Sequence, residues 1–151
     1  MKKLFASLLI LLCSYSYATV APAYLETADA QADLNHALSQ AQASKKKVLI
    51  VFGANWCKDC LELDKSFKAE NAALIASQFV LVKIDVGQFD KNLTIANAYG
   101  NPIKKGIPAA VILRADNTLL YASKGGELSN ARRMGDAGIA QFFQQILSQH
   151  P

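Results

Sequence analysis

The sequence has few of the side chains that hold metal ions. Its 151 residues include three cysteines and two histidines. His36 and His150 lie far along the chain from the paired cysteines Cys57 and Cys60, and there is no second cysteine pair, so a closed zinc site is not expected. Haem attachment requires a histidine directly after the second cysteine, and Leu61 stands there. We therefore expect no metal and no bound cofactor.

The sequence also lacks an apolar run long enough to span a bilayer, which takes about 20 residues. The apolar run 4–12 follows two lysines and precedes the small residues of segment 16–18. This order is typical of an export signal, so we predict a signal peptide over residues 1–18 and a location in the periplasm. The alternatives are a lipoprotein anchored through Cys13 and an uncleaved helical anchor.

The net charge of the chain is small once the predicted signal peptide is removed. The formal charge of the whole sequence is +4, and the loss of the two signal lysines leaves about +2, which does not favour binding to nucleic acid or to a membrane surface. Hydrophobic residues make up 52% of the chain, and no repeat, low-complexity tract or long linker divides it. We predict one monomeric domain over residues 19–151, with Ala21 and Ala23 as alternative cleavage ends.

The spacing of apolar residues predicts alternating helices and strands. Continuous apolar runs favour strands, and apolar residues three and four apart favour helices. We expect strands at 48–52, 79–86, 109–113 and 118–122, and helices at 27–44, 57–68, 72–77 and 90–99. A last helix carries the apolar stripe Ile139, Phe142, Phe143, Ile146 and Leu147. This order predicts an α/β fold with a central mixed β-sheet of about four to five strands flanked by helices.

Cys57 and Cys60 stand where the apolar segment 48–52 is expected to turn into a helix. A helix N-terminus offers unpaired N–H groups and a partial positive charge, which favour a thiolate over a thiol. We therefore expect the pKa of Cys57 to lie below the usual value of about 8.5. Lys58 acts in the same direction and Asp59 in the opposite one, so their joint effect stays open. A structural staple is disfavoured, because a disulfide that closes so short a loop stabilises little.

Asp64 is the candidate proton acceptor. It lies four residues after Cys60 and seven after Cys57, and at about 3.6 residues per turn the three share one helix face. A carboxylate there could take the proton from Cys60, directly or through water. The alternative is a surface ion pair of Asp64 with Lys68, four residues further on.

Three segments resemble the thioredoxin superfamily. Residues 48–60 contain Trp-Cys-Lys-Asp-Cys after a strand, residues 96–100 read Ala-Asn-Ala-Tyr-Gly, and residues 106–108 read Gly-Ile-Pro before a later strand. The resemblance extends from about residue 27 to 148. The cysteine segment is similar to the periplasmic thioredoxin-like domain of membrane thiol–electron transporters and to small exported disulfide isomerases. The resemblance implies the thioredoxin fold and thiol–disulfide chemistry carried by the cysteine pair itself.

The resemblance also implies a role for each residue around the cysteines. Cys57 is the exposed attacking cysteine, and Cys60 is the buried resolving cysteine. Pro108 matches the family's cis-proline, a minority form that is held where the fold requires it. It presents the backbone of Ile107 to a substrate strand, and Trp56 shapes the docking surface. The catalytic candidates are Cys57, Cys60, Pro108 and Asp64, and the substrate-binding candidates are Trp56 and Ile107.

Three departures from the thioredoxin pattern affect this interpretation. Thioredoxin itself carries a buried aspartate six residues before the first cysteine, where this chain has Val51. It has Gly-Pro between the cysteines, where this chain has Lys58-Asp59. The segment 101–105 lengthens the link before the cis-proline, and we expect it to form a lip there. The transporter domain has an acid four residues after its second cysteine, as Asp64 is here, which supports the proton-transfer role.

Together these features predict a periplasmic thiol–disulfide oxidoreductase that exchanges the Cys57–Cys60 dithiol with protein disulfides as a reductant. Ile107 before the proline and Trp56 before the motif resemble the reducing branch of the family. The expected partners are exported cysteine-containing proteins and a membrane electron donor. The alternatives are a disulfide isomerase, a non-catalytic thioredoxin-fold binding module, and a copper-handling module that uses the dithiol as soft ligands.

Overall fold

The computed structural model describes residues 21–151, which form a mixed sheet with helices on both faces. The strands are β1 (Lys47–Gly53), β2 (Phe79–Asp85), β3 (Ala109–Leu113) and β4 (Leu119–Ala122), in the spatial order β2-β1-β3-β4. β1 runs parallel to β2 and antiparallel to β3, and β4 is antiparallel to β3. The strands predicted from the sequence are confirmed to within about a residue at each end.

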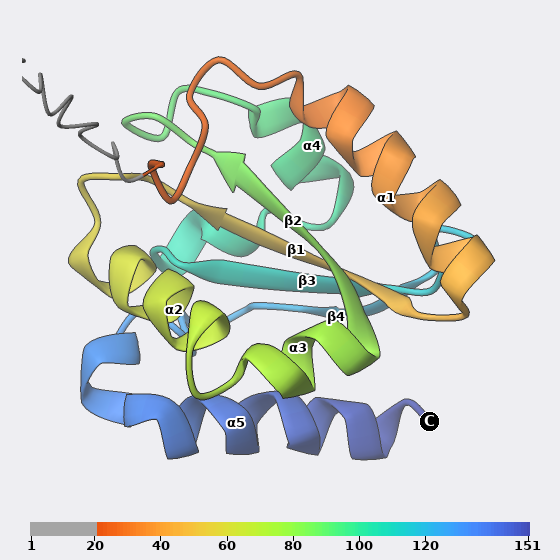
Figure 1. Ribbon diagram of the computed structural model, residues 1–151. Helices are drawn as coiled ribbons and strands as arrows, with labels where there is room; N and C mark the ends of the chain where they lie inside the picture. The colour runs from red at the N-terminus through yellow and green to blue at the C-terminus, as the bar shows by residue number, and fades with distance from the viewer. Residues whose placement is uncertain (1–20) are drawn as a thin grey trace, which may run out of the picture.

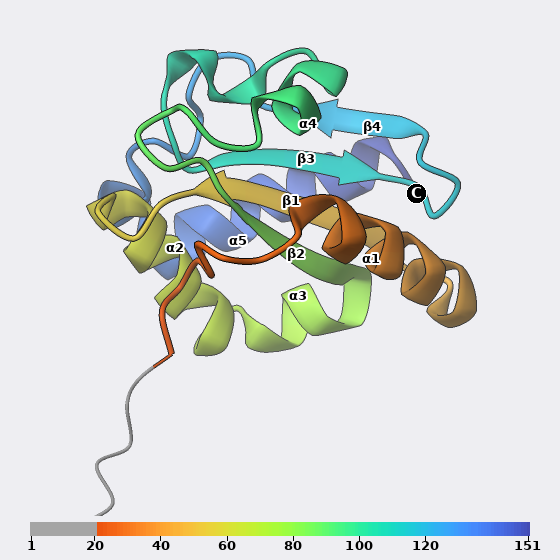
Figure 2. The ribbon, with the colours of Figure 1, turned by 90° about the horizontal axis from the view of Figure 1, so that it is seen from above.

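The helices cover the two faces of the sheet. The helical segments are α1 (Ala30–Ser44), α2 (Lys58–Lys68), α3 (Ala72–Gln78), α4 (Leu93–Ala98), the 3₁₀ helix η1 (Pro102–Lys105) and α5 (Ala131–Gln149). Figure 1 shows α1 and α4 on one face and α2, α3 and α5 on the other, and the view from above in Figure 2 shows α1 crossing over β2 and β1. This three-layer arrangement is the thioredoxin fold, and it confirms the predicted fold class.

β1 is a central strand, and the cysteine motif follows its C-terminal end. Residues 48–52 are at most 1% exposed, as expected for a strand covered on both faces. The register pairs Phe52, near the end of β1, with Ala109 at the start of β3. The chain therefore leaves β1 beside the residue that directly precedes β3, which is Pro108.

Two helices begin later than the sequence predicts. The helix expected at 90–99 is confined to α4, because Asn92 adopts a left-handed conformation with φ of 55° and lies outside the helix. The helix expected from residue 27 begins at Ala30, after the N-cap residue Asp29. The carboxylate of Asp29 accepts a hydrogen bond from the N–H of Ala32, which satisfies a free donor of the first turn. Residues 86–92 consequently form a loop next to the cysteine motif.

The predicted signal peptide, residues 1–18, lies outside the described residues, and so do Cys13 and the expected start of the domain at residue 19. The predicted division of the chain and the monomeric state stay predictions. None of the helices formed by residues 21–151 combines the length and the apolar character that a bilayer-spanning helix needs.

Candidate active site

The junction of β1 and α2 holds both cysteines in one helical turn. Cys57 is the N-cap residue of α2, with extended backbone angles (φ −84°, ψ 109°). Its sulfur accepts a hydrogen bond from the backbone N–H of Cys60 at 3.2 Å, which is the bond that a serine or aspartate oxygen forms at many helix N-termini. The N–H of Cys57 donates in turn to the carbonyl of Ala54 at 3.1 Å. The local chain path therefore aims the free N–H groups of α2 at one sulfur.

The two cysteines differ in exposure. Both are free thiols. Cys57 is 7% exposed, whereas Cys60 is 0% exposed and lies in the core. The cysteine predicted to be exposed is thus largely covered, and of the two only Cys57 keeps a small exposed fraction that a disulfide of another protein can approach. This is the geometry that the predicted attack by Cys57 and resolution by Cys60 require, and the roles themselves stay predictions.

The surroundings also separate the two thiols in acidity. A hydrogen bond from the Cys60 thiol lowers the pKa of Cys57 to about 7, against the opposing effect of burial. Backbone N–H groups of Cys60 and Asp59 lower it further. The same sulfur–sulfur hydrogen bond, together with burial, raises the pKa of Cys60 far above its usual value. Near neutral pH a large share of Cys57 is therefore thiolate, the reactive form, while Cys60 keeps its proton.

The segment before β3 faces the Cys57 sulfur. The peptide bond between Ile107 and Pro108 is cis. The Cys57 thiol donates to the carbonyl oxygen of Ile107, with 3.5 Å between sulfur and oxygen. The side chain of Ile107 is buried, so its backbone is the part that the sulfur contacts. The predicted use of this backbone to present a substrate strand stays a prediction.

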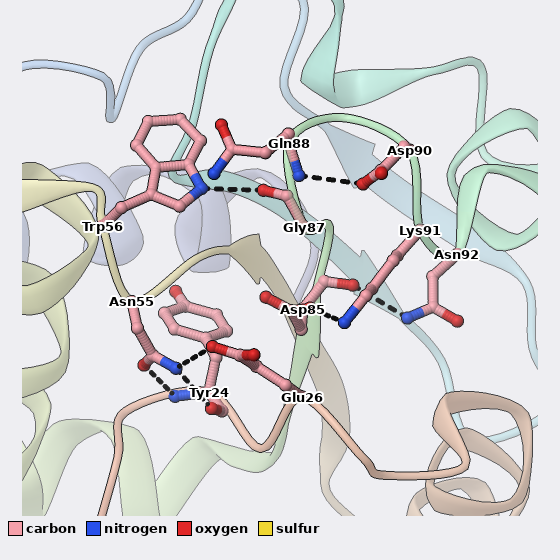
Figure 3. Close-up of polar contacts among 10 residues, drawn as sticks. All are labelled: Tyr24, Glu26, Asn55, Trp56, Asp85, Gly87, Gln88, Asp90, Lys91 and Asn92. Carbon is pink, nitrogen blue, oxygen red and sulfur yellow. Dashed lines mark hydrogen bonds and ion pairs between the residues drawn. The ribbon is translucent and has the colours of Figure 1, made fainter.

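Trp56 and the loop before α4 form a wall beside the cysteines. Trp56 is 49% exposed, and its indole N–H donates to the carbonyl of Gly87 at 2.8 Å (Figure 3). Its ring lies 6.0 Å from the ring of Phe89, tilted by 59°. Phe89 has a positive φ of 65° and is itself exposed. The sequence drew attention to Trp56 but not to Phe89, because nothing in the loop's own pattern signals contact with the motif.

An open hollow of about 480 Å³ continues this surface towards the cis-proline. The predicted lip at residues 101–105 is present as η1, with Ile103 buried. The residues that line the hollow include Phe89, Leu93, Asn101, Lys104 and Gly106. Gly106 directly precedes Ile107, so the hollow and the sulfur-facing backbone lie next to each other.

Asp64 sits between two lysines. Its side chain is 10% exposed. Oδ2 lies 2.7 Å from Nζ of Lys68, and Oδ1 accepts a hydrogen bond from Lys83 of β2. The pair with Lys68 that the sequence offered as an alternative is thus formed, between a buried carboxylate and a lysine that is 58% exposed. Asp64 shares its charge with Lys83 as well, which the helix spacing did not indicate. Proton transfer between Asp64 and Cys60 stays a prediction.

A contact between α2 and the start of α5 fixes the dipeptide between the cysteines. The carboxylate of Asp59 accepts hydrogen bonds from the backbone N–H, Nε and Nη2 of Arg132 at 3.0, 3.3 and 3.2 Å. Burial opposes ionisation of Asp59, but the bonds from Arg132 outweigh it and lower the pKa of that carboxyl. The sequence gave no sign of this pair, because its members are 73 residues apart.

The described residues offer few ligands beyond the two sulfurs. Within residues 21–151, no group of three or more histidine, cysteine, aspartate or glutamate side chains converges so that it could hold a metal ion. His36 lies on α1, and His150 is the C-cap residue of α5.

We predict that Arg132 helps to set the acidity of Cys57. The Asp59 carboxylate raises the pKa of Cys57, and Arg132 offsets that charge. Arg132→Gln leaves that negative charge unbalanced and should raise the pKa of Cys57, whereas Asp59→Asn removes the charge and should lower the pKa. The measurement is the rate of iodoacetamide alkylation of the reduced protein against pH, which rises as the thiolate forms.

The matched control is Arg133→Gln, which removes the same charge without removing a hydrogen bond to Asp59. It should shift the alkylation profile less than Arg132→Gln does. Identical profiles for the Arg132, Arg133 and Asp59 variants would contradict the prediction.

Comparison with known proteins agrees with the fold and with the cysteine segment. A family model described as thioredoxin-like matches residues 29–115, a range that includes the cysteine motif and the cis-proline. The crystal structure of a disulphide isomerase from Xylella fastidiosa Temecula1 superposes with a TM-score of 0.82 at 50% sequence identity, and the match covers 85% of this chain and 99% of that chain.

Two curated relatives are similar over a shorter share of their length. They are the thiol:disulfide interchange proteins DsbD of Vibrio vulnificus strains CMCP6 and YJ016, each 30% identical over 115 residues, which is 76% of this chain and 18% of the relative. The chain therefore spans less than a fifth of the length of these relatives. The family model covers more than half of the chain and includes the site described above. The protein belongs to the thioredoxin-like family.

Proposed function

We propose that this protein is an exported thiol–disulfide oxidoreductase that reduces disulfides of client proteins in the periplasm. The observation that carries the proposal is the difference between its two cysteines. Cys57 is 7% exposed, has a pKa of about 7 and contacts the Ile107 carbonyl, whereas Cys60 is fully buried. Thiol–disulfide exchange uses this pairing of an accessible thiolate with a protected resolving thiol.

The exchange takes two steps. The Cys57 thiolate attacks one sulfur of a client disulfide, forms a mixed disulfide and releases the other client sulfur, which takes up a proton. Cys60 then loses its proton and attacks the Cys57 sulfur, and the client leaves with its second thiol. The client disulfide gains two electrons, and the Cys57–Cys60 pair loses them as it closes into a disulfide.

Client binding uses the surface around Cys57. An extended client segment lies along the chain at Ile107 and Pro108 and pairs with its main chain as an added strand does. Trp56 and Phe89 form an apolar wall beside it, and each is a little under half exposed. The hollow next to Gly106 gives the segment room to continue. Main-chain pairing of this kind suits a protein that must accept many clients.

The direction of electron flow is towards the client. Trp56 before the motif and Ile107 before the proline resemble the reducing branch of the family. Each turnover leaves a Cys57–Cys60 disulfide, which a membrane electron donor must reduce again. The similarity to part of DsbD, a thiol:disulfide interchange protein, supports a place in such a chain, and the predicted signal at residues 1–18 supports the periplasm.

Disulfide isomerisation is the second candidate. It is favoured by the likeness to the Xylella fastidiosa disulphide isomerase, which is 50% identical over 85% of this chain. An isomerase needs the same attack by Cys57 but lets another client thiol, and not Cys60, resolve the mixed disulfide. Recovery of activity from scrambled ribonuclease by the Cys60→Ser variant would favour this candidate over the reductant.

We predict that reduction of insulin by dithiothreitol is accelerated by the mature protein and that Cys57→Ser returns the rate to the background. Cys60→Ser keeps the attacking thiolate but removes the resolving thiol, so it should accumulate a mixed disulfide with insulin. Turbidity reports the reduction, and mass spectrometry reports the trapped adduct. A Cys57→Ser variant as active as the wild type would contradict the proposed function.

We predict that Asp64→Asn slows the release of the mixed disulfide at neutral pH and leaves the fold intact. An asparagine cannot take a proton from Cys60, and general-base catalysis contributes about a hundredfold or more where it operates directly. Allowing for a relay through water, we expect a loss of at least about tenfold. The control is Glu62→Gln, an exposed acid on the same helix that pairs with Lys65. Unchanged exchange rates between pH 5 and pH 9, measured for both variants, would remove Asp64 from the mechanism.

A further inference from the structure

Tyr24 is buried next to the cysteine pair, although it comes from the segment before α1. It is 1% exposed, and it belongs to no helix or strand. Its hydroxyl end lies against Gly53, at the end of β1, and the neighbouring Cys60 contributes to the raised pKa of Tyr24. The residues of β1 that follow Lys47 are all apolar, and Val51 stands where thioredoxin itself has an aspartate. Tyr24 therefore supplies a polar group where β1 has none.

The cysteine motif itself holds Tyr24 in place. Oδ1 of Asn55 accepts a hydrogen bond from the N–H of Tyr24 at 2.9 Å, and Nδ2 of Asn55 donates to the Tyr24 carbonyl at 2.8 Å. Figure 3 shows this amide against the Tyr24 main chain, on the turn that leads to Trp56. The two bonds fix the main chain of Tyr24 to the turn between β1 and α2.

Gly53, the last residue of β1, leaves space for the hydroxyl end of the ring. A Cβ atom at this position would lie 2.3 Å from both Cζ and Oη of Tyr24. That separation is far inside van der Waals contact, so any larger residue would push the hydroxyl away. The absence of a side chain at Gly53 is what allows the Tyr24 hydroxyl to reach its place beside Cys60.

The Tyr24 hydroxyl acts as a hydrogen-bond donor. Burial, and then the nearby Cys60, Cys57 and Asp64, raise the pKa of Tyr24 well above its usual value, so the phenol keeps its proton at neutral pH. The ammonium group of Lys83 lies 5.9 Å from the centre of the tyrosine ring. The same group forms a hydrogen bond with the Asp64 carboxylate, so a lysine–aspartate ion pair lies beside the ring. A neutral phenol that faces a sulfur can offer one proton to it in a hydrogen bond.

Cys60 needs such a donor in the second step of the exchange. In the reduced protein, the hydrogen bond to Cys57 is the main cause that raises the pKa of Cys60, and burial adds to it. In the mixed disulfide, Cys57 no longer carries a thiolate. Burial is then the main cause that disfavours the Cys60 thiolate. Hydrogen bonding from Tyr24 acts against that effect, since it lowers the pKa of Cys60.

We propose that the Tyr24 hydroxyl is a catalytic hydrogen-bond donor that stabilises the Cys60 thiolate while it resolves the mixed disulfide. In this step the Cys60 thiol gives up its proton, and its sulfur bonds to the Cys57 sulfur. The bond between Cys57 and the client sulfur breaks, and the departing client sulfur takes up a proton. Tyr24 donates only a hydrogen bond and is unchanged at the end. The inference rests on the proposed function, because it concerns the second step of that reaction.

The test separates the two steps in a single reaction. Reduced protein is mixed in a stopped-flow instrument with one equivalent of dithionitrobenzoate, an aromatic disulfide. Attack by Cys57 releases a first coloured nitrothiobenzoate, and resolution by Cys60 releases a second. The variant is Tyr24→Phe, which keeps the ring and removes only the hydroxyl. The control is Tyr99→Phe, whose hydroxyl bonds to Asn117 at 2.8 Å.

We expect Tyr24→Phe to slow the second release by about three- to tenfold and to leave the first release unchanged. A hydrogen bond to a charged group shifts a pKa by about one to two units. The larger thiolate fraction speeds the attack, but roughly half of this increase in rate is lost because a less basic thiolate is a weaker nucleophile. Gly53→Ala, which displaces the hydroxyl without removing it, should cause the same selective loss, and Tyr99→Phe should change neither phase.

Each outcome decides one of the two claims. Selective slowing of the second release supports the role of Tyr24. Equal slowing of both phases, or of neither, in a Tyr24→Phe protein whose thermal unfolding matches the wild type overturns that role and leaves the proposed function standing. A wild-type protein that never releases a second equivalent overturns the proposed exchange itself, and the role of Tyr24 with it.

Discussion

The hydrogen bond from the Cys60 N–H to the Cys57 sulfur is the interaction on which the chemistry of this protein depends. It makes the sulfur the N-cap of α2. The hydrogen bond from the Cys60 thiol is the main cause that lowers the pKa of Cys57 to about 7, and the N–H bond adds to it. The buried β1 strand and its register with β3 hold this turn opposite the Ile107 carbonyl. The sheet and its helices thus place a single reactive sulfur at the end of a helix, within reach of other proteins.

The stabilisation of this thiolate is moderate, and that bears on the direction of electron flow. Burial and the Asp59 carboxylate oppose the ionisation of Cys57, while Arg132 offsets part of the second effect. A stabilised thiolate stabilises the reduced pair, so a very acidic cysteine goes with an oxidising protein. Thioredoxin has a cysteine pKa of about 7 and a potential of about −270 mV, whereas a strongly oxidising member has about 3.5 and about −120 mV. A pKa of about 7 for Cys57 resembles that of thioredoxin and is in line with the direction of electron flow proposed above.

The sequence was sufficient for the sheet and for the position of the cysteines, because both leave local patterns. The unbroken apolar run 48–52 predicts a strand buried on both faces, and the spacing of the motif after it predicts a helix start. The contacts between distant segments leave no such pattern. Arg132 reaches Asp59 across 73 residues, and Tyr24 is held by Asn55 across 31 residues. These pairs depend on how the helices and the N-terminal segment pack against the sheet, and only the three-dimensional structure reveals them.

The most direct test of this account is the reduction potential of the Cys57–Cys60 pair in the mature protein. Equilibration in defined dithiothreitol redox buffers, followed by alkylation and mass spectrometry, gives the ratio of dithiol to disulfide at each potential. The account predicts a value close to that of thioredoxin, about −270 mV. A value at or above about −180 mV, the range of disulfide isomerases and oxidants, would contradict it.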